Sequence, residues 1–571
     1  MEPLDAAAVA RLLTEIAQRL ELAGEMPYSI RAYHNAAHSV LGLNVPLAEV
    51  VAKGKLREIP GVGEAIAEKI IKLHKTGTHP TLEHLREQMP SGVLDLLQVP
   101  GLGPKKVALL YTELKVSSLE ELEEACKTGK LKPIKGLGSA LQSHCLEAIE
   151  KMRQRVGQQR LNEAASDMQA VRNYLQQQNP GWVRVEFAGT LRRACELVTD
   201  FTLVAEGDSR RVEKHEAVRI NVSDASHFGV TLLFATGSAE HVSALQAYAA
   251  AKDLKLTADG LWRQKSGVAP ASVPAGEEIL CREERDVYAA LGLPYIEPEL
   301  REGRPLFGAK NEVEAAAAGN LPALIRDADL RGVLHCHSSF SDGHETLHGM
   351  AEAARKLGYH YFGIADHSKS AFYAGGLKEE TIREQHKQVD KLNAEYAAQD
   401  FRVFKGIESD ILQDGALDYS DDVLQSFDFV VASIHSRFGL GKEAQTQRLI
   451  AAASNPRTTI LGHPSGRLLL QRDAYDIDLD AVLQACAKNG VVVEINAHPQ
   501  RLDLDWRWHQ RALELGCMLA INPDAHSRAE LEVVHWGVLM ARKGAVPRGR
   551  ILNCMELPAI AEFFAKRKAR S

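Results

Sequence analysis

Seven apolar runs between residues 331 and 526 each end in polar side chains, most of them able to bind a metal ion. Helical patterns separate the runs, as expected for parallel strands that are buried on both faces. In barrels of alternating strands and helices, functional side chains lie at the carboxyl ends of the strands. We therefore predict a (β/α)7 barrel with a metal site at one mouth. The runs are RGVLHCH, YFGIADH, FRVFKGIESD, FDFVVASIH, TTILGHP, VVVEINAH and CMLAINPDAH.

The candidate ligands are imidazoles and carboxylates without a thiolate, which suits Zn²⁺, Mn²⁺ or Fe²⁺. Two of them, His335 and His337, are two residues apart and so point to one side of a strand. A single histidine at a strand end is more often structural, but seven successive strands with polar ends are hard to explain in that way. The nine candidates are His335, His337, Asp342, His367, Glu408, His435, His463, Asp524 and His526.

Three arginines follow strand ends in the same half of the chain: Arg437, Arg467 and Arg501. A guanidinium can hold a phosphate through two parallel hydrogen bonds. These residues are therefore candidates for binding a substrate phosphate, with solvated loop arginines as the alternative.

The composition constrains the cellular compartment of the protein and the kinds of partner that it can bind. The chain has 571 residues and a net charge of −7, so any DNA binding must come from local sites. No apolar run is long enough to cross a membrane, and the first residues lack the basic start of a signal peptide. The eight cysteines form no C-x-x-C pair, which fits a reducing compartment. We expect a cytoplasmic monomer without a membrane partner.

The first 160 residues contain short helical patterns and one repeat. Each copy has a hydrophobe, a short turn and Gly-hydrophobe-Gly, followed by an amphipathic segment. Such glycines allow a tight turn and expose N–H groups at the next helix start, where a phosphate can bind. The copies are IPGVGEAIAEKI (59–70), VPGLGPKKVALL (99–110) and IKGLGSALQSHC (134–145).

The repeat resembles the helix-hairpin-helix motif, which implies binding to the DNA backbone without reading of base identity. The first two copies have Pro before the turn, whereas the third has Lys135 there and is expected to be mainly structural. A helical corner without a ligand is the alternative. The candidate DNA-binding residues are Gly61, Gly63, Gly101 and Gly103.

Residues 161–236 differ from the helical region before them. Their short apolar runs predict strands, and the runs are VRVEFAG, FTLVAE, EAVRINV and GVTLLFAT. Residues 188–204 read AGTLRRACELVTDFTLV. This stretch resembles the nucleotide-binding signature of family X DNA polymerases: Gly-Ser, Arg-Arg, then Asp-x-Asp on a strand. RAYHNAAHSV and AALGLPYIEPELRE extend the resemblance over residues 1–315. It implies an α+β, nucleotidyltransferase-like palm and thumb, in which Gly189, Thr190 and Arg192 bind the nucleotide and Asp200 is catalytic.

The polymerase chemistry requires three carboxylates that hold two Mg²⁺ ions. Asp200 is the first, but the second position holds Thr202, and counting back from Phe228-Gly229 places the third at Arg219. A cation at the third position repels metal ions, so we predict a palm that mainly binds DNA and lacks Mg²⁺. An active gap-filling polymerase is the alternative. Nearby carboxylates that could substitute are Glu206, Asp208 and Asp224.

Lys69 matches the position of the lyase lysine in related N-terminal domains. A lysine with a depressed pKa could form a Schiff base with an abasic sugar. A solvated helix lysine is the favoured alternative.

Residues 329–571 resemble the PHP (polymerase and histidinol phosphatase) domain, and all nine ligand positions of that domain are filled. The resemblance implies up to three metal ions and phosphoester hydrolysis. One ion would take His335, His337, Glu408 and Asp524. A second would share Glu408 and add His435 and His463. The third would take Asp342, His367 and His526.

Together, the two resemblances imply a bacterial family X DNA polymerase with a C-terminal PHP domain and a role in DNA repair. We predict a 3′–5′ exonuclease that processes gapped, nicked or 3′-ended duplex DNA. A small-molecule phosphatase and a non-enzymatic DNA-binding scaffold are further alternatives. The expected parts are two helical domains (1–85 and 86–160), palm (161–236), thumb (237–315), linker (316–328) and PHP barrel (329–571).

Overall fold

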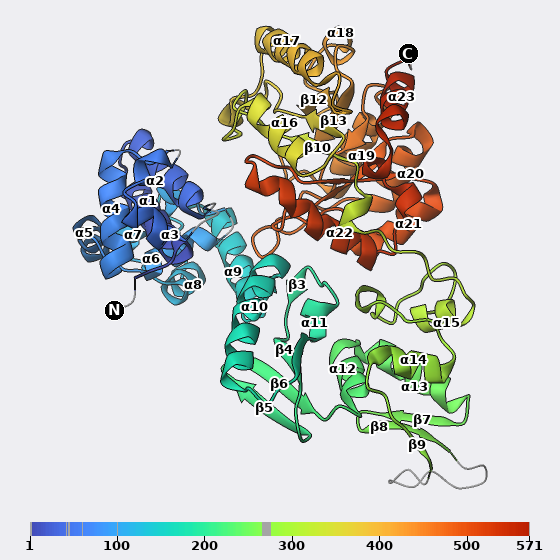
Figure 1. Ribbon diagram of the computed structural model, residues 1–571. Coiled ribbons are helices and arrows are strands. Elements are labelled where there is room, and N and C mark those ends of the chain that lie inside the picture. Colours follow the sequence, from blue (N-terminus) through green and yellow to red (C-terminus); the bar gives the residue numbers. More distant parts are fainter. Residues whose placement is uncertain are drawn as a thin grey trace. The chain divides into compact units, whose positions relative to one another are not determined.

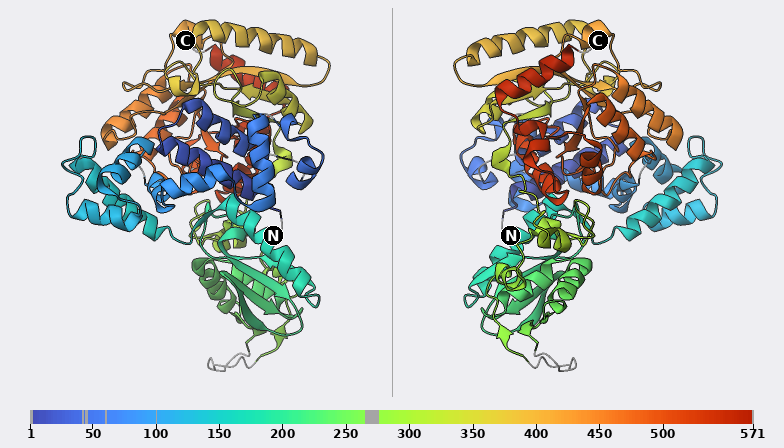
Figure 2. Two further views of the ribbon diagram at one scale, coloured as in Figure 1. Left: turned by 90° about the vertical axis from the view of Figure 1, so that its left-hand side faces the viewer. Right: turned by 90° about the vertical axis from the view of Figure 1, so that its right-hand side faces the viewer.

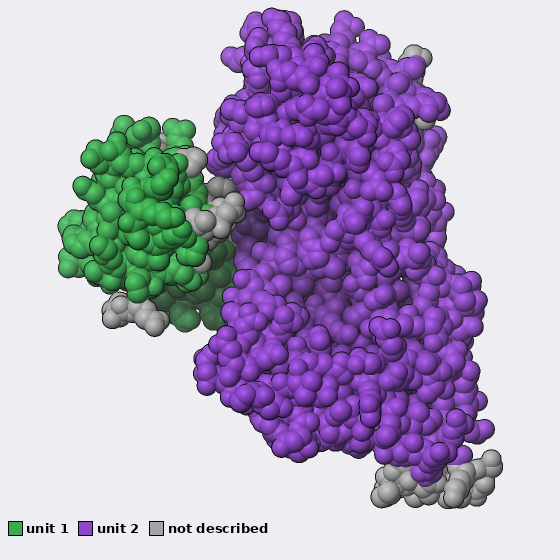
Figure 3. Space-filling view, viewed as in Figure 1, with its two compact units in different colours: residues 1–156 green, residues 157–571 purple. Residues whose placement is uncertain are grey.

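The computed structural model describes residues 3–41, 43, 46–59, 61–99, 101–264 and 276–569. Pro60 and Pro100, which precede two of the glycine turns, lie outside the described residues. The chain forms two compact units, residues 1–156 and residues 157–571 (Figure 3).

The first unit is helical throughout its described residues, as predicted. Its apolar side chains form two cores. One consists of residues between Val9 and Leu85, and the other consists mainly of residues between Met89 and Ile149. Side chains of Asp5 and Ser118 cap two of the helices by accepting backbone N–H groups. The α-helices are α1 Ala6–Leu22, α2 Pro27–Leu41, α3 Leu47–Ala52, α4 Glu64–Thr76, α5 Pro80–Gln88, α6 Gly92–Asp95, α7 Pro104–Leu114, α8 Leu119–Lys127 and α9 Ser139–Gln154.

The second unit begins with β1 (Gln159–Arg160), which pairs with β3 (Leu197–Val198), and with α10 (Leu161–Gln178). A four-stranded sheet has the order β2-β4-β6-β5 (Figure 1). Strands β4 and β6 are parallel, and the outer pairs are antiparallel. A three-stranded sheet follows in the order β7-β8-β9. The strands are β2 Arg184–Phe187, β4 Thr202–Glu206, β5 Arg211–His215, β6 Val218–Ser223, β7 Leu254–Thr257, β8 Gly260–Arg263 and β9 Glu278–Ile279.

One predicted strand of this region is wrong. GVTLLFAT lies in a helix, α12 (Phe228–Thr236), which packs on β4 and β6. Nearly all of its residues are apolar, and an apolar run of this length has no period that separates a buried helix from a buried strand. The helices that follow are α13 Ala239–Ala250, α14 Glu284–Leu291 and α15 Glu312–Ala317.

Seven parallel strands in sequence order form the predicted barrel (Figure 1). An isolated parallel bridge between Cys336 and Ala525 joins its first and last strands. Phe564 of α23 (Leu557–Lys568) packs against Phe404 and Phe429 inside the barrel. The strands are β10 Gly332–Cys336, β11 Tyr361–Ile364, β12 Arg402–Asp410, β13 Phe429–Ser433, β14 Ile460–Leu461, β15 Val492–Asn496 and β16 Leu519–Asn522.

Helices between the strands cover the outside of the barrel. The longest of them, α17, lies across the barrel in gold in Figure 2 and packs against β12. The helices are α16 Leu347–Lys356, α17 Glu379–Tyr396, α18 Asp421–Leu424, α19 Lys442–Ser454, α20 Leu479–Asn489, α21 His509–Leu515 and α22 Val534–Lys543.

A buried ion triad joins the palm to the thumb. Arg192 donates from its two terminal nitrogens to the carboxylate of Glu284 at 2.7 and 2.6 Å, and Arg301 donates to the same carboxylate at 2.6 Å. Burial raises the pKa of Glu284, but Arg301 and Arg192 outweigh burial and lower it to about 2. Arg192 was predicted to bind a nucleotide; its guanidinium belongs to this triad, and the nucleotide role stays a prediction.

Glu284→Ala is expected to lower the free energy of unfolding by about 3–5 kcal/mol, because it leaves two buried cations without a counter-charge. The contribution of Glu284 is complete above its ordinary pKa of 4.5 and disappears as the pH falls from there toward about 2. Urea unfolding followed by circular dichroism, at pH 7 and at pH 3, measures both effects. Glu562→Ala, at an exposed glutamate, is the control and should unfold like the wild type. A loss in Glu284→Ala no larger than in this control contradicts the prediction.

Candidate metal centre and nucleic-acid interface

The nine predicted ligands meet at the carboxyl ends of the barrel strands. They form four overlapping groups whose ligand atoms lie within 4.8 Å of one another. The groups are His337, Asp342, His367, His526; His335, His337, Glu408; His335, His463, Asp524; and His367, Glu408, His435. The number of ions and their division among these residues stay predictions.

Glu408 is the centre of the cluster. Its carboxylate oxygens lie 3.2 Å from His335 Nε2, 3.0 Å from His463 Nε2 and 3.2 Å from His435 Nε2. It also lies 2.9 Å from His367 Nδ1. Burial raises its pKa, but the neighbouring histidines hold the pKa well below the ordinary value. The carboxylate therefore stays ionised and available to a cation.

Several buried ligand atoms make no hydrogen bond with any described residue. Buried polar atoms are normally paired, so a group of such atoms facing one another indicates a missing partner. The chemistry of the set, imidazole nitrogens and carboxylate oxygens, fits divalent metal ions. The atoms are His335 Nε2, His337 Nδ1, His367 Nδ1, Glu408 Oε2 and His463 Nδ1.

Two further carboxylates orient ligand histidines by binding their Nδ1 atoms. His335 Nδ1 lies 2.6 Å from Glu494 Oε1, and His435 Nδ1 lies 2.6 Å from Asp410 Oδ1. Such a bond fixes the tautomer, so the opposite nitrogen faces the metal. The sequence analysis missed both residues, although each lies in an apolar run that was used to predict a strand.

The three arginines predicted to bind phosphate differ in their surroundings. The Nε of Arg501 lies 3.4 Å from Asp524 Oδ2, beside the cluster, and Arg437 is exposed. Arg467 donates to the carbonyls of Arg501 and Leu502 and to the carboxylate of Asp505. These contacts make Arg467 a support of this loop, and its role as a phosphate ligand stays a prediction.

The three glycine turns of the first unit share one backbone geometry. In each, the first glycine adopts positive φ, and the second begins a helix without a side-chain cap. The N–H groups of the first helical turn therefore point toward any bound phosphate. The third copy has this geometry too, although Lys135 replaces Pro. The pairs are Gly61 and Gly63, Gly101 and Gly103, and Gly136 and Gly138.

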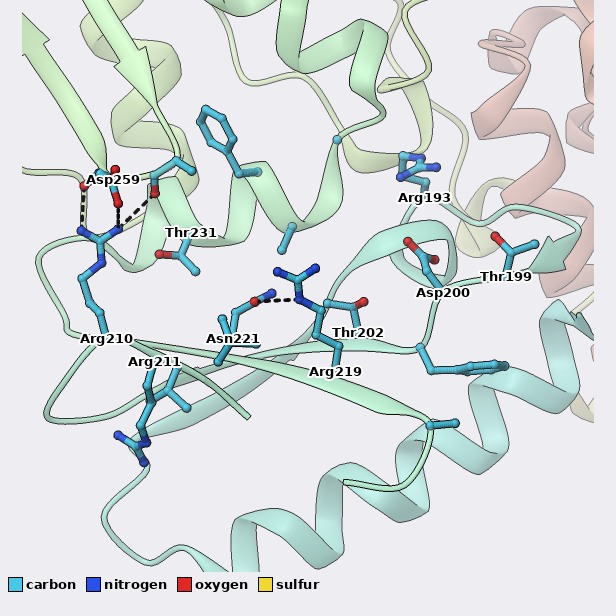
Figure 4. A pocket seen from close by; sticks show the side chains of 18 residues that line it. Arg193, Thr199, Asp200, Thr202, Arg210, Arg211, Arg219, Asn221, Thr231 and Asp259 are labelled. Atoms are coloured by element: carbon cyan, nitrogen blue, oxygen red, sulfur yellow. Dashed lines mark hydrogen bonds and ion pairs between the residues drawn. The ribbon is translucent and has the colours of Figure 1, made fainter. Parts of the chain in front are cut away.

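The palm holds a pocket of about 840 Å³ above the sheet (Figure 4). Thr202 and Arg219 line it as direct neighbours in β4 and β6. The backbone N–H of Thr190 donates to the Asp200 carboxylate at 2.6 Å. Asp259 also lines the pocket.

The carboxylates considered as substitutes do not line the described pocket, although one of them, Asp208, contacts the pocket residue Arg211. Glu206 pairs with Arg184 at 2.8 Å, Asp208 lies 3.3 Å from Arg211, and Asp224 pairs with His227 at 2.8 Å.

Four arginines line this pocket, and three of them have a carboxylate partner. Arg193 pairs with Glu302, Arg210 lies 3.5 Å from Asp259, and Arg211 pairs with Glu213. Among the described residues, the fourth, Arg219, has no carboxylate partner, and its Nε donates to Asn221 Oδ1 at 3.3 Å. In Figure 4 its guanidinium points into the pocket. The pocket therefore presents a positive charge at the position predicted for the third metal-binding carboxylate.

Comparison with known proteins agrees with these sites. Family models match a helix-hairpin-helix domain at residues 5–79, a SAM-like helix-hairpin-helix tandem at 93–141, a DNA polymerase beta thumb at 231–302 and a PHP domain at 334–498. The DNA polymerase/3′-5′ exonuclease PolX of Bacillus subtilis is 33% identical over 98% of this chain and 99% of its own. The chain belongs to the family X DNA polymerases that carry a PHP domain.

Other relatives cover less than half of the chain. A probable phosphatase of Thermoanaerobacter sp. is 25% identical over 41% of this chain and 95% of its own, and one of Shewanella sp. is 25% identical over 42% and 92%. The PHP match ends before Asp524 and His526, which the structure nevertheless brings into the metal cluster. None of the described helices combines the length and apolar character that a membrane span requires.

In this family X protein, Lys69 lies half-buried on α4. Its Nζ is 3.4 Å from the carbonyl of Ala65 and 5.8 Å from the centre of the Tyr33 ring. These contacts are those of a lysine on a helix surface. The lyase role stays a prediction.

Asp410→Asn is expected to weaken Mn²⁺ binding about 10- to 100-fold, because it removes the charge that supports His435 as a ligand. Isothermal titration calorimetry of the metal-depleted protein measures the affinity. Asp390→Asn, at an exposed carboxylate on α17 that is 65% exposed, is the control. Equal affinity in Asp410→Asn and the wild type would remove Asp410 from the metal centre.

Proposed function

We propose that the barrel is a metal-dependent 3′–5′ exonuclease that processes DNA ends, and that the polymerase half binds the DNA. The observation that supports this most is the contrast between the two sites. All nine barrel ligands gather in four groups, six of the nine are buried, and several of the buried ligand atoms are unsatisfied. The palm has Thr202 and Arg219 in place of two carboxylates.

In the proposed reaction, a water oxygen attacks the terminal phosphorus, the bond from phosphorus to the 3′ oxygen breaks, and a proton passes to the leaving oxygen. Bound Mn²⁺, Zn²⁺ or Fe²⁺, up to three ions, would generate the hydroxide and neutralise the phosphoryl charge. Glu408 and Asp524 supply negative charge to hold them, and Glu494 and Asp410 orient the histidines. Arg501, beside Asp524, and the exposed Arg437 are proposed to bind the scissile phosphate.

The DNA is proposed to be gapped, nicked or 3′-ended duplex, held by the glycine turns of the first unit. Two separate cores in that unit support the proposed division into domains 1–85 and 86–160. Palm (161–236), thumb (237–315), linker (316–328) and barrel (329–571) complete the proposed organisation. We propose that the protein acts as a monomer.

A small-molecule phosphatase is the second candidate, because the C-terminal half matches probable phosphatases over more than 90% of their length. The helix-hairpin-helix matches favour DNA as substrate. Hydrolysis of a phosphomonoester with kcat/KM far above that for DNA would favour the phosphatase.

His335→Ala is expected to reduce primer shortening more than about 100-fold, since it removes a buried metal ligand rather than a supporting residue. The assay uses a 5′-labelled primer across a short gap, with Mn²⁺ and deoxynucleotides, resolved on a gel. His360→Ala, at a histidine that is 40% exposed, should shorten the primer like the wild type. Primer lengthening that survives His335→Ala but disappears in Asp200→Ala would instead establish an active polymerase.

Arg219→Ala is expected to weaken DNA binding and to reduce the slope of log affinity against log salt by about 1, because one phosphate contact is lost. Fluorescence anisotropy with labelled gapped DNA, without divalent ions, gives both quantities. Arg211→Ala is the matched control, since Arg211 lines the same pocket but pairs with Glu213. Unchanged affinity and slope in Arg219→Ala would show that the palm pocket does not contact DNA phosphate.

A further inference from the structure

Two adjacent aromatic side chains lie exposed beside the metal centre. Phe372 is 86% exposed and Tyr373 is 63% exposed, and Phe372 has the largest exposed fraction of the described large apolar residues. Both belong to the short helix η5 (Phe372–Ala374). The Tyr373 ring centre lies 6.4 Å from that of the predicted ligand His367. Exposed neighbouring aromatics at a site mouth are typical of a binding surface.

The loop that carries these rings is fixed at its base. The N–H of Leu377 donates to the carbonyl of His367 at 2.8 Å, so the loop closes directly on a ligand residue. Ser370 donates its N–H to Asp418 at 2.6 Å. Gly376 packs so closely that a Cβ would lie 1.9 Å from the carbonyl oxygen of Ser368. The exposure of the rings therefore follows from a constrained backbone.

The electrostatic surroundings connect Tyr373 with the metal ligands. The carboxylates of Asp410, Glu408 and Asp342 are the charged neighbours of its hydroxyl. A ligand at this mouth meets metal-binding carboxylates on one side and neutral aromatic rings on the other. A nucleotide fits both, because it joins a phosphodiester to an aromatic base.

We propose that Phe372 and Tyr373 form a platform on which the unpaired base of the 3′-terminal nucleotide stacks. The platform makes the barrel select nucleic-acid strand ends over free phosphomonoesters. This proposal rests on the proposed exonuclease function of the same site. Stacking on aromatic side chains accepts every base, because each base has an aromatic face.

A binding experiment tests the platform without cleavage. An oligonucleotide carries 2-aminopurine at its 3′ end, whose fluorescence falls on stacking, and Ca²⁺ replaces Mn²⁺. The wild type is expected to quench the fluorescence, and Phe372→Ala/Tyr373→Ala to abolish the quenching. Tyr373→Phe keeps the ring and should quench like the wild type. Tyr174→Ala, at an exposed tyrosine on α10, is the control. Equal quenching by the wild type and the double variant would overturn the proposal.

A cleavage experiment compares a 3′ end that carries a base with one that carries an abasic residue, in Mn²⁺. The double variant should lower kcat/KM for the base-bearing end about 10- to 100-fold and leave the abasic end unchanged. An equal loss on both ends would overturn the platform. Absence of cleavage of either end by the wild type would refute the exonuclease function, and the fluorescence experiment would still decide whether the base stacks.

Discussion

The barrel depends on one buried carboxylate. Glu408 is fully buried, and transfer of an ionised group from water costs several kcal/mol unless opposite charges or metal ions compensate. Its compensating histidines come from different strand ends, namely His335 in β10, His435 after β13 and His463 after β14. The strand order therefore has to bring four separate segments to one point. The bridge between Cys336 and Ala525 closes the barrel around that point.

The palm and the barrel differ in how their charged groups are satisfied. In the palm, protein partners occupy the groups that a polymerase would use: Asp200 accepts from Thr190, and Arg192 pairs with Glu284. In the barrel, His335 Nε2 and His463 Nδ1 are buried and make no hydrogen bond with the described residues, whereas the other ring nitrogen of each is paired. Buried polar atoms are normally paired, so these two atoms indicate a place for a ligand. This contrast supports the proposed metal chemistry of the barrel, and the activity of the palm stays a prediction.

The sequence predicted the nine ligands because parallel strands end at one edge, so position along the chain already determines position in space. It did not reveal that Glu494 and Asp410 orient histidines, because their roles depend on partners in other strands. For the same reason the sequence did not reveal that Arg192 pairs with Glu284 and that Arg467 pairs with Asp505, because these partners lie distant in sequence. Helix α12 was missed because burial on all sides removes the periodic pattern.

None of the proposed DNA-binding sites depends on the base sequence of the DNA. Backbone N–H groups at the glycine turns bind phosphates, which are the same in every nucleotide. The guanidinium of Arg219 also fits a phosphate, and the rings of Phe372 and Tyr373 stack on any base. Base identity is read by directed hydrogen bonds to base edges, and none of these contacts is of that kind. These proposed contacts therefore recognise DNA structure rather than sequence. The structure is an unpaired 3′ end beside a bound duplex, and end processing requires this specificity.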